Sequence, residues 1–262
     1  MKITFALLLL LLLISAGFVI SSVSKGPDVR LFQFAKLQAE RGNPKAQYDL
    51  ALLYANGKGT ATNETEAMKW IRKAAAQGEP RSQAVLGASF ANAGKGSPQD
   101  DIEAEKLFRK SAEQGWAEGQ HNLACCYMDG RGIKQDDKLA LEWFSKAAAQ
   151  GYADAQYHVA HFFLTGRAVD KDEVEAVKWL AKAAENGHAN AQFYFGSAYA
   201  IGTGVRQDYV QAYKWVTLAL EQGKGDKAAL PALIEKMTPE QIKEAEWLAR
   251  EFKSLHSQKP QP

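Results

Sequence analysis

The imidazole and thiol side chains are the groups in this 262-residue chain that could most readily do chemistry. His158 and His161 lie three residues apart in a segment with helical spacing, so their imidazoles are expected on one helix face. His121 lies in an earlier segment of the same kind. A metal site also needs a third ligand in suitable geometry and neighbours that orient it, and the sequence contains no zinc-binding motif. The pattern favours polar surface residues over a metal site, so we predict no metal and no cofactor.

The two cysteines, Cys125 and Cys126, are adjacent. On a helix their side chains point about 100° apart, and adjacent cysteines rarely pair, so no disulfide framework is expected. We interpret both as small residues packed near the core, with a redox or intermolecular role as the alternative. His188 follows a glycine in a turn between two helical segments, where we expect it to be solvated.

The paired acids Asp100–Asp101 and Asp136–Asp137 could form a carboxylate site. Each pair falls where a helix is expected to begin, and acids there cap free N–H groups and complement the helix dipole. Asn63 begins an Asn-Glu-Thr glycosylation acceptor, but it also holds a predicted cap position. We therefore assign helix-capping roles to these residues.

Motifs of the common enzyme classes are missing from the sequence. It has no phosphate-binding glycine loop, no serine elbow, no EF-hand loop and no nucleophile with a recognisable partner base. With 32 Lys and Arg against 30 Asp and Glu, the net charge is +2, and nothing suggests the clustered basic face of a nucleic-acid-binding protein. We predict that the protein is not an enzyme and binds no nucleic acid.

A repeat of about 36 residues dominates the chain and must position these side chains. Glycines mark it at Gly42, Gly78, Gly115, Gly151, Gly187 and Gly223, glutamines at Gln47, Gln83, Gln120, Gln156 and Gln192, and further glycines at Gly57, Gly94, Gly130, Gly166 and Gly202. One spacing of 37 residues places an extra residue near Ala93. The agreement predicts five tandem structural repeats.

Each repeat is predicted to be two helices joined by a turn. In the fourth repeat Gly151 ends the preceding helix, and a first helix opens at Ala153 with the apolar stripe Ala155, Gln156, Val159, Ala160 and Phe163. Gly166 breaks this helix. A second helix follows, capped by Asp172, and the equivalent caps are Asn63, Asp100, Asp136 and Asp208. Its apolar face is Ala176, Trp179, Leu180, Ala183 and Ala184.

The third repeat reads Gly119-Gln120, Leu123-Ala124, Tyr127, Gly130-Arg131-Gly132, Ala140, Trp143, Lys146-Ala147-Ala148 and Gly151. This pattern resembles the Sel1-like repeat, a relative of the tetratricopeptide repeat, over residues 42 to about 225. The resemblance implies an all-α fold, a right-handed α/α solenoid of five Sel1-like helix-turn-helix repeats with helical caps. Leu107, Ala168 and Leu218 depart from the pattern without breaking it.

The predicted repeats are 42–77, 78–114, 115–150, 151–186 and 187–225. We expect an N-terminal capping helix at 25–41, C-terminal capping helices at 226–256 that include a Thr238-Pro239 helix start, and a disordered tail at 257–262. Residues 1–24 combine Lys2 with an apolar run and predict a signal peptide or an N-terminal membrane anchor. The protein is thus expected to be exported, either periplasmic or secreted, or anchored to the inner membrane by residues 3–20.

The predicted first helices also present a less repetitive stripe, at positions two, five and nine residues after the repeat glutamine. These positions lie opposite the core, on the concave face that such solenoids use for binding. Our candidate partner-binding residues on it are Asp49, Asn56, Asn92, Asn122, Asp129, His158, His161 and Tyr194. The stripe is completed by Leu52, Val85, Ala88, Cys125, Thr165, Ser197 and Ile201. Its variation between repeats would suit a partner that does not repeat, and tyrosine is a frequent interface anchor.

These observations favour a non-catalytic protein–protein interaction scaffold of the bacterial cell envelope, or a secreted one. It would bind a protein or peptide along the concave groove as a monomer. The bacterial setting and the adaptor role are what the resemblance implies. One alternative is a cell-wall-active or β-lactam-type hydrolase, an activity assigned to some similar proteins, although this chain lacks the regularly spaced cysteine pairs of that branch. A second alternative is a structural spacer.

Overall fold

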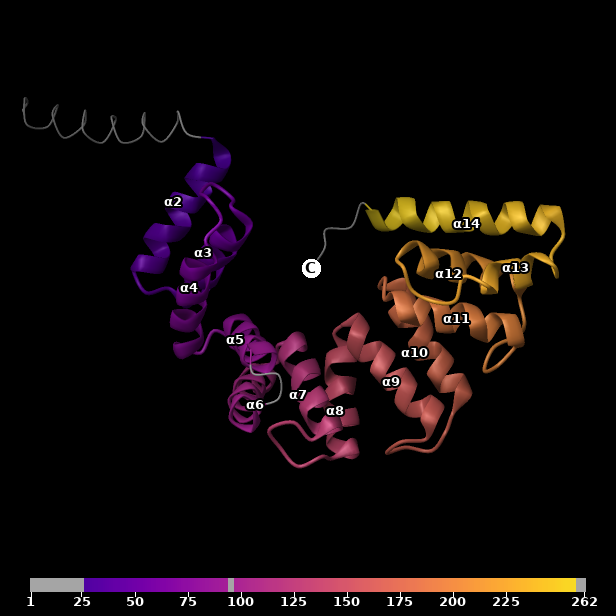
Figure 1. Ribbon diagram of the computed structural model, residues 1–262, viewed down its shortest axis with the longest axis horizontal. Helices are drawn as coiled ribbons and strands as arrows, with labels where there is room; N and C mark the ends of the chain where they lie inside the picture. The colour runs from indigo at the N-terminus through magenta and orange to yellow at the C-terminus, as the bar shows by residue number, and fades with distance from the viewer. Residues whose placement is uncertain (1–25, 94–96, 258–262) are drawn as a thin grey trace, which may run out of the picture. The chain divides into compact units, whose positions relative to one another are not determined.

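The computed structural model describes residues 26–93 and 97–257, and all regular structure in these residues is helical (Figure 1). The predicted signal peptide or anchor at 1–24 lies outside the described residues, as do residues 258–262 of the predicted tail. Ser257 is the last residue of the final helix. In the described part of the chain, no helix has the length and apolar character needed to cross a membrane.

The chain divides into two compact units, residues 1–114 and 115–262. The described helices of unit 1 are α2 (Pro27–Glu40), α3 (Pro44–Asn56), α4 (Glu64–Ala76), α5 (Pro80–Ala93) and α6 (Pro98–Glu113). Those of unit 2 are α7 (Ala117–Asp129), α8 (Asp137–Ala149), α9 (Ala153–Thr165), α10 (Glu173–Glu185), α11 (Ala189–Ile201), α12 (Tyr209–Glu221), α13 (Ala229–Ile234) and α14 (Pro239–Ser257). We call α3, α5, α7, α9 and α11 the first helices of the five repeats, and α4, α6, α8, α10 and α12 the second helices.

Consecutive helices pack against each other within each unit. The first helices α3, α5, α9 and α11 each lie between the second helix of their own repeat and the helix that precedes them. In unit 2, α13 and α14 pack on α12 after the last repeat. This stacking of helix pairs is that of an α/α solenoid with helical caps and confirms the predicted fold class.

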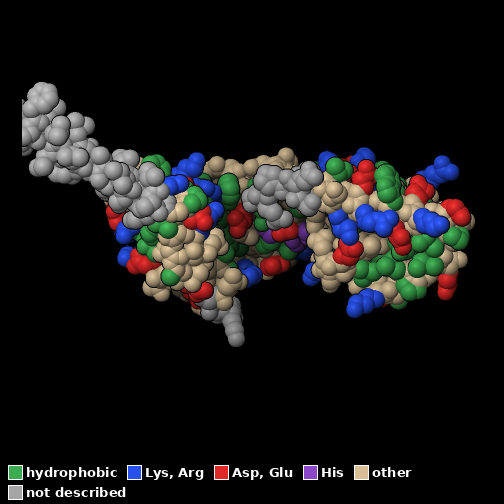
Figure 2. Space-filling view, turned by 90° about the horizontal axis from the view of Figure 1, so that it is seen from above, with side chains coloured by type: hydrophobic (Ala, Val, Ile, Leu, Met, Phe, Trp, Pro, Cys, Tyr) green, Lys and Arg blue, Asp and Glu red, His purple; other side chains and the backbone are tan. Residues whose placement is uncertain are grey.

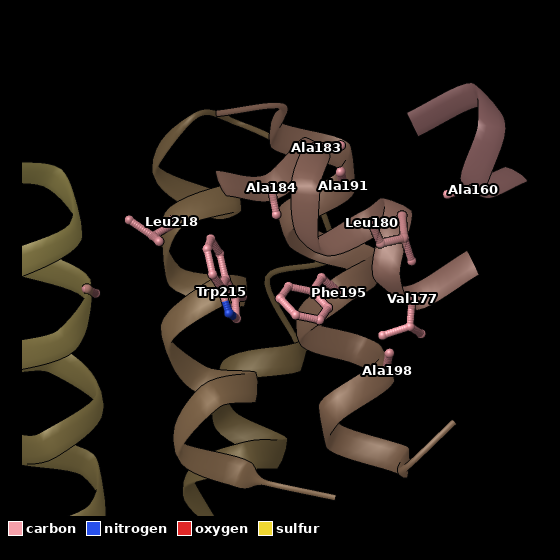
Figure 3. Close-up of a cluster of buried hydrophobic side chains, with 11 residues drawn as sticks. Ala160, Val177, Leu180, Ala183, Ala184, Ala191, Phe195, Ala198, Trp215 and Leu218 are labelled. Carbon is pink, nitrogen blue, oxygen red and sulfur yellow. The ribbon is translucent and has the colours of Figure 1, made fainter. Parts of the chain in front are cut away.

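The core of unit 2 combines large and small side chains. Phe195 and Trp215 face each other with ring centroids 5.4 Å apart, and Leu180 belongs to the same cluster (Figure 3). Ala183 of α10 is fully buried in the same cluster, and its small side chain leaves space for the rings of Phe195 and Trp215. Ala249 of α14 joins this cluster, and the last helix therefore covers apolar surface that the final repeat would otherwise expose.

Two glycines inside first helices mark close approaches between helices. A Cβ atom added at Gly196 would lie 2.9 Å from the Val216 side chain and 3.0 Å from the Ala212 carbonyl oxygen. At Gly87 the added atom would lie 2.7 Å from the Phe108 ring. The other three repeats have alanine at this position, so no side chain larger than a methyl group stands there in any repeat.

The predicted core stripe of the fourth repeat is wrong at one position. Phe162 is the buried phenylalanine, with 1% of its surface exposed, whereas Phe163 is half-buried. The prediction of a single amphipathic stripe assumes that neighbouring helices cover only one side of α9. Because α9 packs between α8 and α10, two sides are covered, and Phe162 takes the position that Cys126 holds in the third repeat.

The predicted caps of the second helices hold in four repeats. Side chains of Asn63, Asp136, Asp172 and Asp208 accept hydrogen bonds from backbone N–H groups of the first turn. The expectation is wrong for Asp100, because α6 begins at Pro98 and its cap position is Ser97. Proline is favoured in the first turn, where its missing N–H would have had no helical partner. Asp100 therefore lies inside the first turn rather than before it.

A buried glutamine joins the two helices of its repeat to the last helix of the preceding repeat. The side-chain amide of Gln156 in α9 donates to the Ala148 carbonyl oxygen at the end of α8, with a nitrogen-to-oxygen distance of 3.1 Å. Its oxygen accepts from the amide of Asn186, which follows α10, at 3.0 Å. The corresponding amide pairs are Gln77–Gln47, Gln114–Gln83, Gln150–Gln120 and Gln222–Gln192. The sequence showed the repeated glutamine, but not this role.

Replacing Gln156 by Leu tests this contact, because leucine fills similar space without the amide. We expect the free energy of unfolding in urea to fall by about 1–2 kcal/mol, since the buried oxygen of Ala148 loses one of its donors. The partner Asn186 is exposed, so Asn186→Ala is expected to cost less than about 1 kcal/mol. Equal losses in the two variants would contradict the view that the buried half of the contact matters more.

Candidate functional site

The predicted stripe of unit 1 is only partly open. Leu52 is 41% exposed, and Asn56 and Asn92 are also exposed. Asp49 instead lies beside Arg81, with 3.6 Å between a guanidinium nitrogen and a carboxylate oxygen. The Arg81 guanidinium stacks over Tyr48, 4.0 Å from the ring centre. The Asp49 side chain is nevertheless 49% exposed, and the shorter ion pair of Arg81 is made with the buried Glu79 at 2.7 Å.

The predicted stripe of unit 2 contains both open and packed side chains. Tyr194 and Ile201 are 48% and 71% exposed, and Asp129 and His161 are exposed as well. Asn122 and His158, by contrast, are half-buried. Helical periodicity placed these residues on one side of their helices, but it could not show which of them neighbouring helices cover.

A continuous row of aromatic and imidazole rings crosses the first helices of unit 2. We call it the ring band: His121, Phe144, Tyr152, Tyr157, His158, His188 and Tyr194. His158 stacks on Phe144 with centroids 4.5 Å apart, and Tyr157 lies 5.9 Å from His158 and 6.0 Å from Tyr194. Imidazole side chains reach the surface beside acidic ones (Figure 2). The ring band thus combines the fully buried Phe144 of α8 with rings of the first helices and of the turns before them.

Sequence reasoning missed several members of the ring band, although a signal was present. The residue directly after the repeat glutamine is Tyr48, His121, Tyr157 and Phe193 in four of the five repeats. The predicted stripe begins only at the second residue after the glutamine. The position one residue after the glutamine lies at the edge of the buried face, where a ring can pack on one side and still meet solvent on the other.

The expectation that His188 is solvated is wrong. Its side chain is only 13% exposed, and its ring stacks on Tyr157 with 4.5 Å between centroids. Its Nδ1 atom accepts a hydrogen bond from the Ala191 N–H at 3.0 Å, so His188 caps α11. Its Nε2 atom faces Asp154 at 3.6 Å. The turn residue is thus a packed helix cap, which its position after Gly187 did not reveal.

The structure also brings together three side chains that the sequence analysis did not group. The ligand-type atoms of His121, Cys125 and His158 all lie within 4.8 Å of one another. The Cys125 sulfur lies 3.8 Å from Nε2 of His121, so the cysteine does have a neighbouring imidazole. The four-residue spacing of His121 and Cys125 was a usable signal, but His158 comes from the next repeat, and only the packing of α9 beside α8 and α7 places it here.

Burial controls the protonation of this group. Burial, reinforced by the imidazoles of His121 and His161, lowers the pKa of His158 to about 4. Burial also lowers the pKa of His121, and it raises the pKa of the Cys125 thiol to about 12. At neutral pH both imidazoles are therefore uncharged and the thiol keeps its proton. A cysteine nucleophile needs the opposite shift, so Cys125 and His121 do not form an activated dyad.

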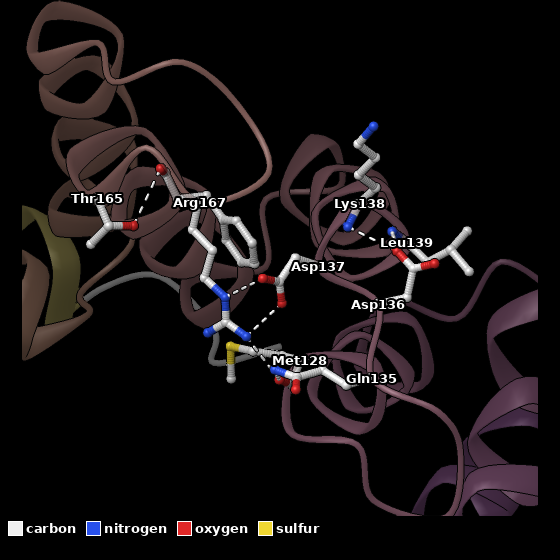
Figure 4. Close-up of polar contacts among 9 residues, drawn as sticks. Met128, Gln135, Asp136, Asp137, Lys138, Leu139, Thr165 and Arg167 are labelled. Carbon is white, nitrogen blue, oxygen red and sulfur yellow. Dashed lines mark hydrogen bonds and ion pairs between the residues drawn. The ribbon is translucent and has the colours of Figure 1, made fainter.

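The acid pair of the third repeat has a structural role that does not involve catalysis. Asp136 caps α8 by accepting from the N–H groups of Lys138 and Leu139, each at 3.0 Å (Figure 4). Asp137 binds the guanidinium of Arg167 through both carboxylate oxygens. Arg167 also donates to the Met128 carbonyl oxygen at 3.0 Å and so joins the turn of the fourth repeat to the third repeat.

The family model for the Sel1 repeat matches five consecutive segments, residues 44–79, 80–116, 117–152, 153–188 and 189–224. The chain belongs to the Sel1 repeat family. Each matched segment begins at the start of a first helix, two residues after the glycine at which our predicted repeats begin. The Sel1 repeat is a non-enzymatic, protein-interaction type of repeat.

Solved structures of Sel1 repeat proteins share this fold. A Sel1 repeat protein from Oxalobacter formigenes is 32% identical with a TM-score of 0.62, over 83% of this chain and 68% of that one. A protective antigen present in uropathogenic Escherichia coli strains, described as displaying an SLR fold, is 27% identical with a TM-score of 0.54, over 90% of this chain. This chain covers 60% of that antigen.

A similarity to a curated protein is limited to a short segment. HRD3A, an ERAD-associated E3 ubiquitin-protein ligase component from Arabidopsis thaliana, is 39% identical over 69 residues. The segment is 26% of this chain and 10% of the plant protein. The chain thus matches only about a tenth of the plant protein's length, and most of the plant protein has no counterpart in this match.

The low pKa of His158 predicts a loss of stability in acid. The unfolded chain takes up a proton near the ordinary histidine pKa of 6.5, whereas folded His158 does so near 4. Between these values the unfolded state binds more protons, so the free energy of unfolding falls as pH falls. We expect His158 to contribute about 1–3 kcal/mol to this loss. His121 and His188, whose pKa values burial also lowers, add losses of the same sign.

Urea unfolding at about pH 7 and about pH 4.5, with a metal chelator present, measures this loss. His158→Phe keeps a ring against Phe144 but cannot titrate, so its stability should depend less on pH. The charge of Asp154 favours the charged form of His158, so Asp154→Asn should steepen the dependence. A wild-type free energy of unfolding that stays constant over this range would contradict the assignment of His158 as a buried neutral imidazole.

Proposed function

We propose that this Sel1 repeat protein is a non-catalytic scaffold that holds a protein or peptide against the first-helix surface of unit 2. The observation that carries the proposal is the ring band, whose member Tyr194 is exposed, together with the exposed Ile201 on the same helix. Packed rings give this surface a fixed shape. Large exposed side chains on such a surface are of the kind that a partner buries, and tyrosine is enriched among residues that dominate binding energy.

The distribution of polar groups supports the same surface. His161 and Asp129 are exposed on neighbouring first helices, and Thr165 is exposed one turn after His161. Interfaces combine an apolar centre with a polar rim that makes hydrogen bonds. We propose that these residues form the rim of a groove along α7, α9 and α11, and that the partner is an extended segment rather than a second copy of the repeats.

We propose further that the protein acts outside the cytoplasm, in the periplasm or as a secreted protein, or anchored by residues 3–20. Lys2 followed by an apolar run supports this location. The partner would then be a protein of the cell envelope or of the surroundings.

The hydrolase and spacer alternatives receive less support. A thiol whose pKa burial raises to about 12 is poorly suited to nucleophilic attack. A plain spacer would have no use for exposed Tyr194 and Ile201 on a ring-rich surface, since exposed apolar side chains favour unwanted association. The scaffold proposal accounts for both observations.

Site-specific photo-crosslinking tests the proposed surface. A photoreactive amino acid is placed at Tyr194 on α11, and in a separate protein at Val174 on α10, which is 53% exposed on a second helix. We expect a discrete crosslinked protein from position 194 and none from position 174. Crosslinking from position 174 alone would place the binding surface on the second helices and contradict the proposal.

Affinity for the captured partner gives the quantitative test. Tyr194→Ala combined with Ile201→Ala should weaken binding by about tenfold or more, because both side chains would lose buried contact area. Val174→Ala removes a comparably exposed apolar side chain from α10 and should change the affinity by less than about twofold. If the wild type, the double variant and Val174→Ala bind the partner with equal affinity, the first-helix surface of unit 2 is not the binding site.

A further inference from the structure

Among the described residues, His121, Cys125 and His158 are the only group of three histidine, cysteine or acidic side chains whose ligand atoms converge. Two of them lie one helical turn apart on α7, and the third comes from α9 of the next repeat. All three residues are half-buried, so the group has both a packed surround and access to solvent. Residues four apart on a helix share one face, which suits them to hold a single ion.

The neighbours hold the histidines in orientations that favour a ligand role. Nδ1 of His121 lies 3.2 Å from Oδ1 of Asn122, an atom that can only accept, so Nδ1 carries the proton. The lone pair is then on Nε2, the atom that faces the Cys125 sulfur at 3.8 Å. Hydrogen bonds of this kind to the second ring nitrogen are a regular feature of metal-binding histidines.

The rings are also fixed by packing. His158 lies flat on Phe144, with an interplanar angle of 14°, and Phe144 has none of its surface exposed. His121 contacts Tyr152 on one side and His158 on another, with centroids 5.1 Å and 5.5 Å apart. A site whose ligands are already held in place loses little side-chain entropy when an ion binds.

The distances suit a small transition-metal ion. Zinc binds imidazole nitrogen and thiolate sulfur at about 2.0–2.3 Å, which places two ligand atoms of a tetrahedral site about 3.3–3.6 Å apart. The nitrogen–sulfur pair of α7 is already near this separation, and the widest separation of 4.8 Å requires a shift of about 1 Å. Calcium and magnesium prefer oxygen ligands, so a set of two nitrogens and one sulfur disfavours them.

We propose that His121, Cys125 and His158 form a three-ligand site for a transition-metal ion of the zinc type, with the fourth position open to solvent. The thiol releases its proton to solvent as its sulfur binds the ion. This site is independent of the proposed partner, because all three ligands belong to one chain.

The equivalent positions elsewhere show that simple repetition does not produce this group. Shifted by one repeat, the three positions hold Tyr157, His161 and Tyr194, which include a single good metal ligand. In unit 1, the first and second repeats hold Tyr48, Leu52 and Val85 there, with no metal ligand. Two imidazoles and a thiol thus coincide at only one pair of repeats.

Cobalt titration of the full-length chain tests the proposal, after treatment with a chelator and under reducing conditions. We expect one equivalent of Co²⁺ to produce visible d–d bands of a tetrahedral site and a near-ultraviolet thiolate-to-cobalt charge-transfer band, and Zn²⁺ to remove both. Cys125→Ala should abolish the charge-transfer band, and His158→Leu should weaken Zn²⁺ binding by about tenfold or more. Circular dichroism of each variant checks that the helices are retained.

Two matched controls separate this site from other histidines and thiols. Cys126→Ala removes the adjacent, buried thiol, and His161→Ala removes the exposed imidazole one turn from His158. Both variants should bind Co²⁺ and Zn²⁺ within about twofold of the wild type. The proposal is overturned if wild type shows no charge-transfer band, or if Cys125→Ala binds Zn²⁺ as tightly as wild type does.

Discussion

The amide of the repeat glutamine is the contact on which the arrangement of each helix pair depends. Gln156 in α9 is 4% exposed. Its side-chain amide makes hydrogen bonds with Ala148 at the end of α8 and with Asn186, the residue that follows α10. An amide in such surroundings is stable only if both its donor and its acceptor find partners. The contact therefore fixes the spacing and direction of three helices at once, where apolar packing alone would tolerate small slides.

The fixed spacing of the helices decides which side chains the residue after the repeat glutamine can contact. His121 and Tyr157 follow Gln120 and Gln156, and their rings contact Tyr152 and His188, the cap residues of the next first helices. Rings from second helices and from the turns reach the same place, as Phe144 and His188 do. The ring band of unit 2 is thus a consequence of the repeat geometry, combined with the aromatic and imidazole residues that this chain carries at those positions.

Burial gives the side chains of this surface properties that their types alone do not have. The pKa of His158 falls to about 4 and that of Cys125 rises to about 12 for the same reason, because each charged form loses solvation. An imidazole with a pKa of about 4 is a weak base, and a thiol with a pKa of about 12 is a weak nucleophile at neutral pH. They suit instead a shaped, uncharged binding surface, and a site at which an ion can displace one proton.

The repeat, the all-helical fold, most of the helix caps and the Sel1 resemblance could be predicted from the sequence, because these depend on residues close together along the chain. Glycine at the helix ends and Asp172 at a helix start act within one turn, and their effects can be read directly. Packing between helices decided the rest. It buried Phe162 rather than Phe163, turned His188 from a solvated turn residue into a packed cap, and brought His158 to His121 and Cys125. These outcomes depend on which sides of a helix its neighbours cover, and periodicity along a single helix does not contain that information.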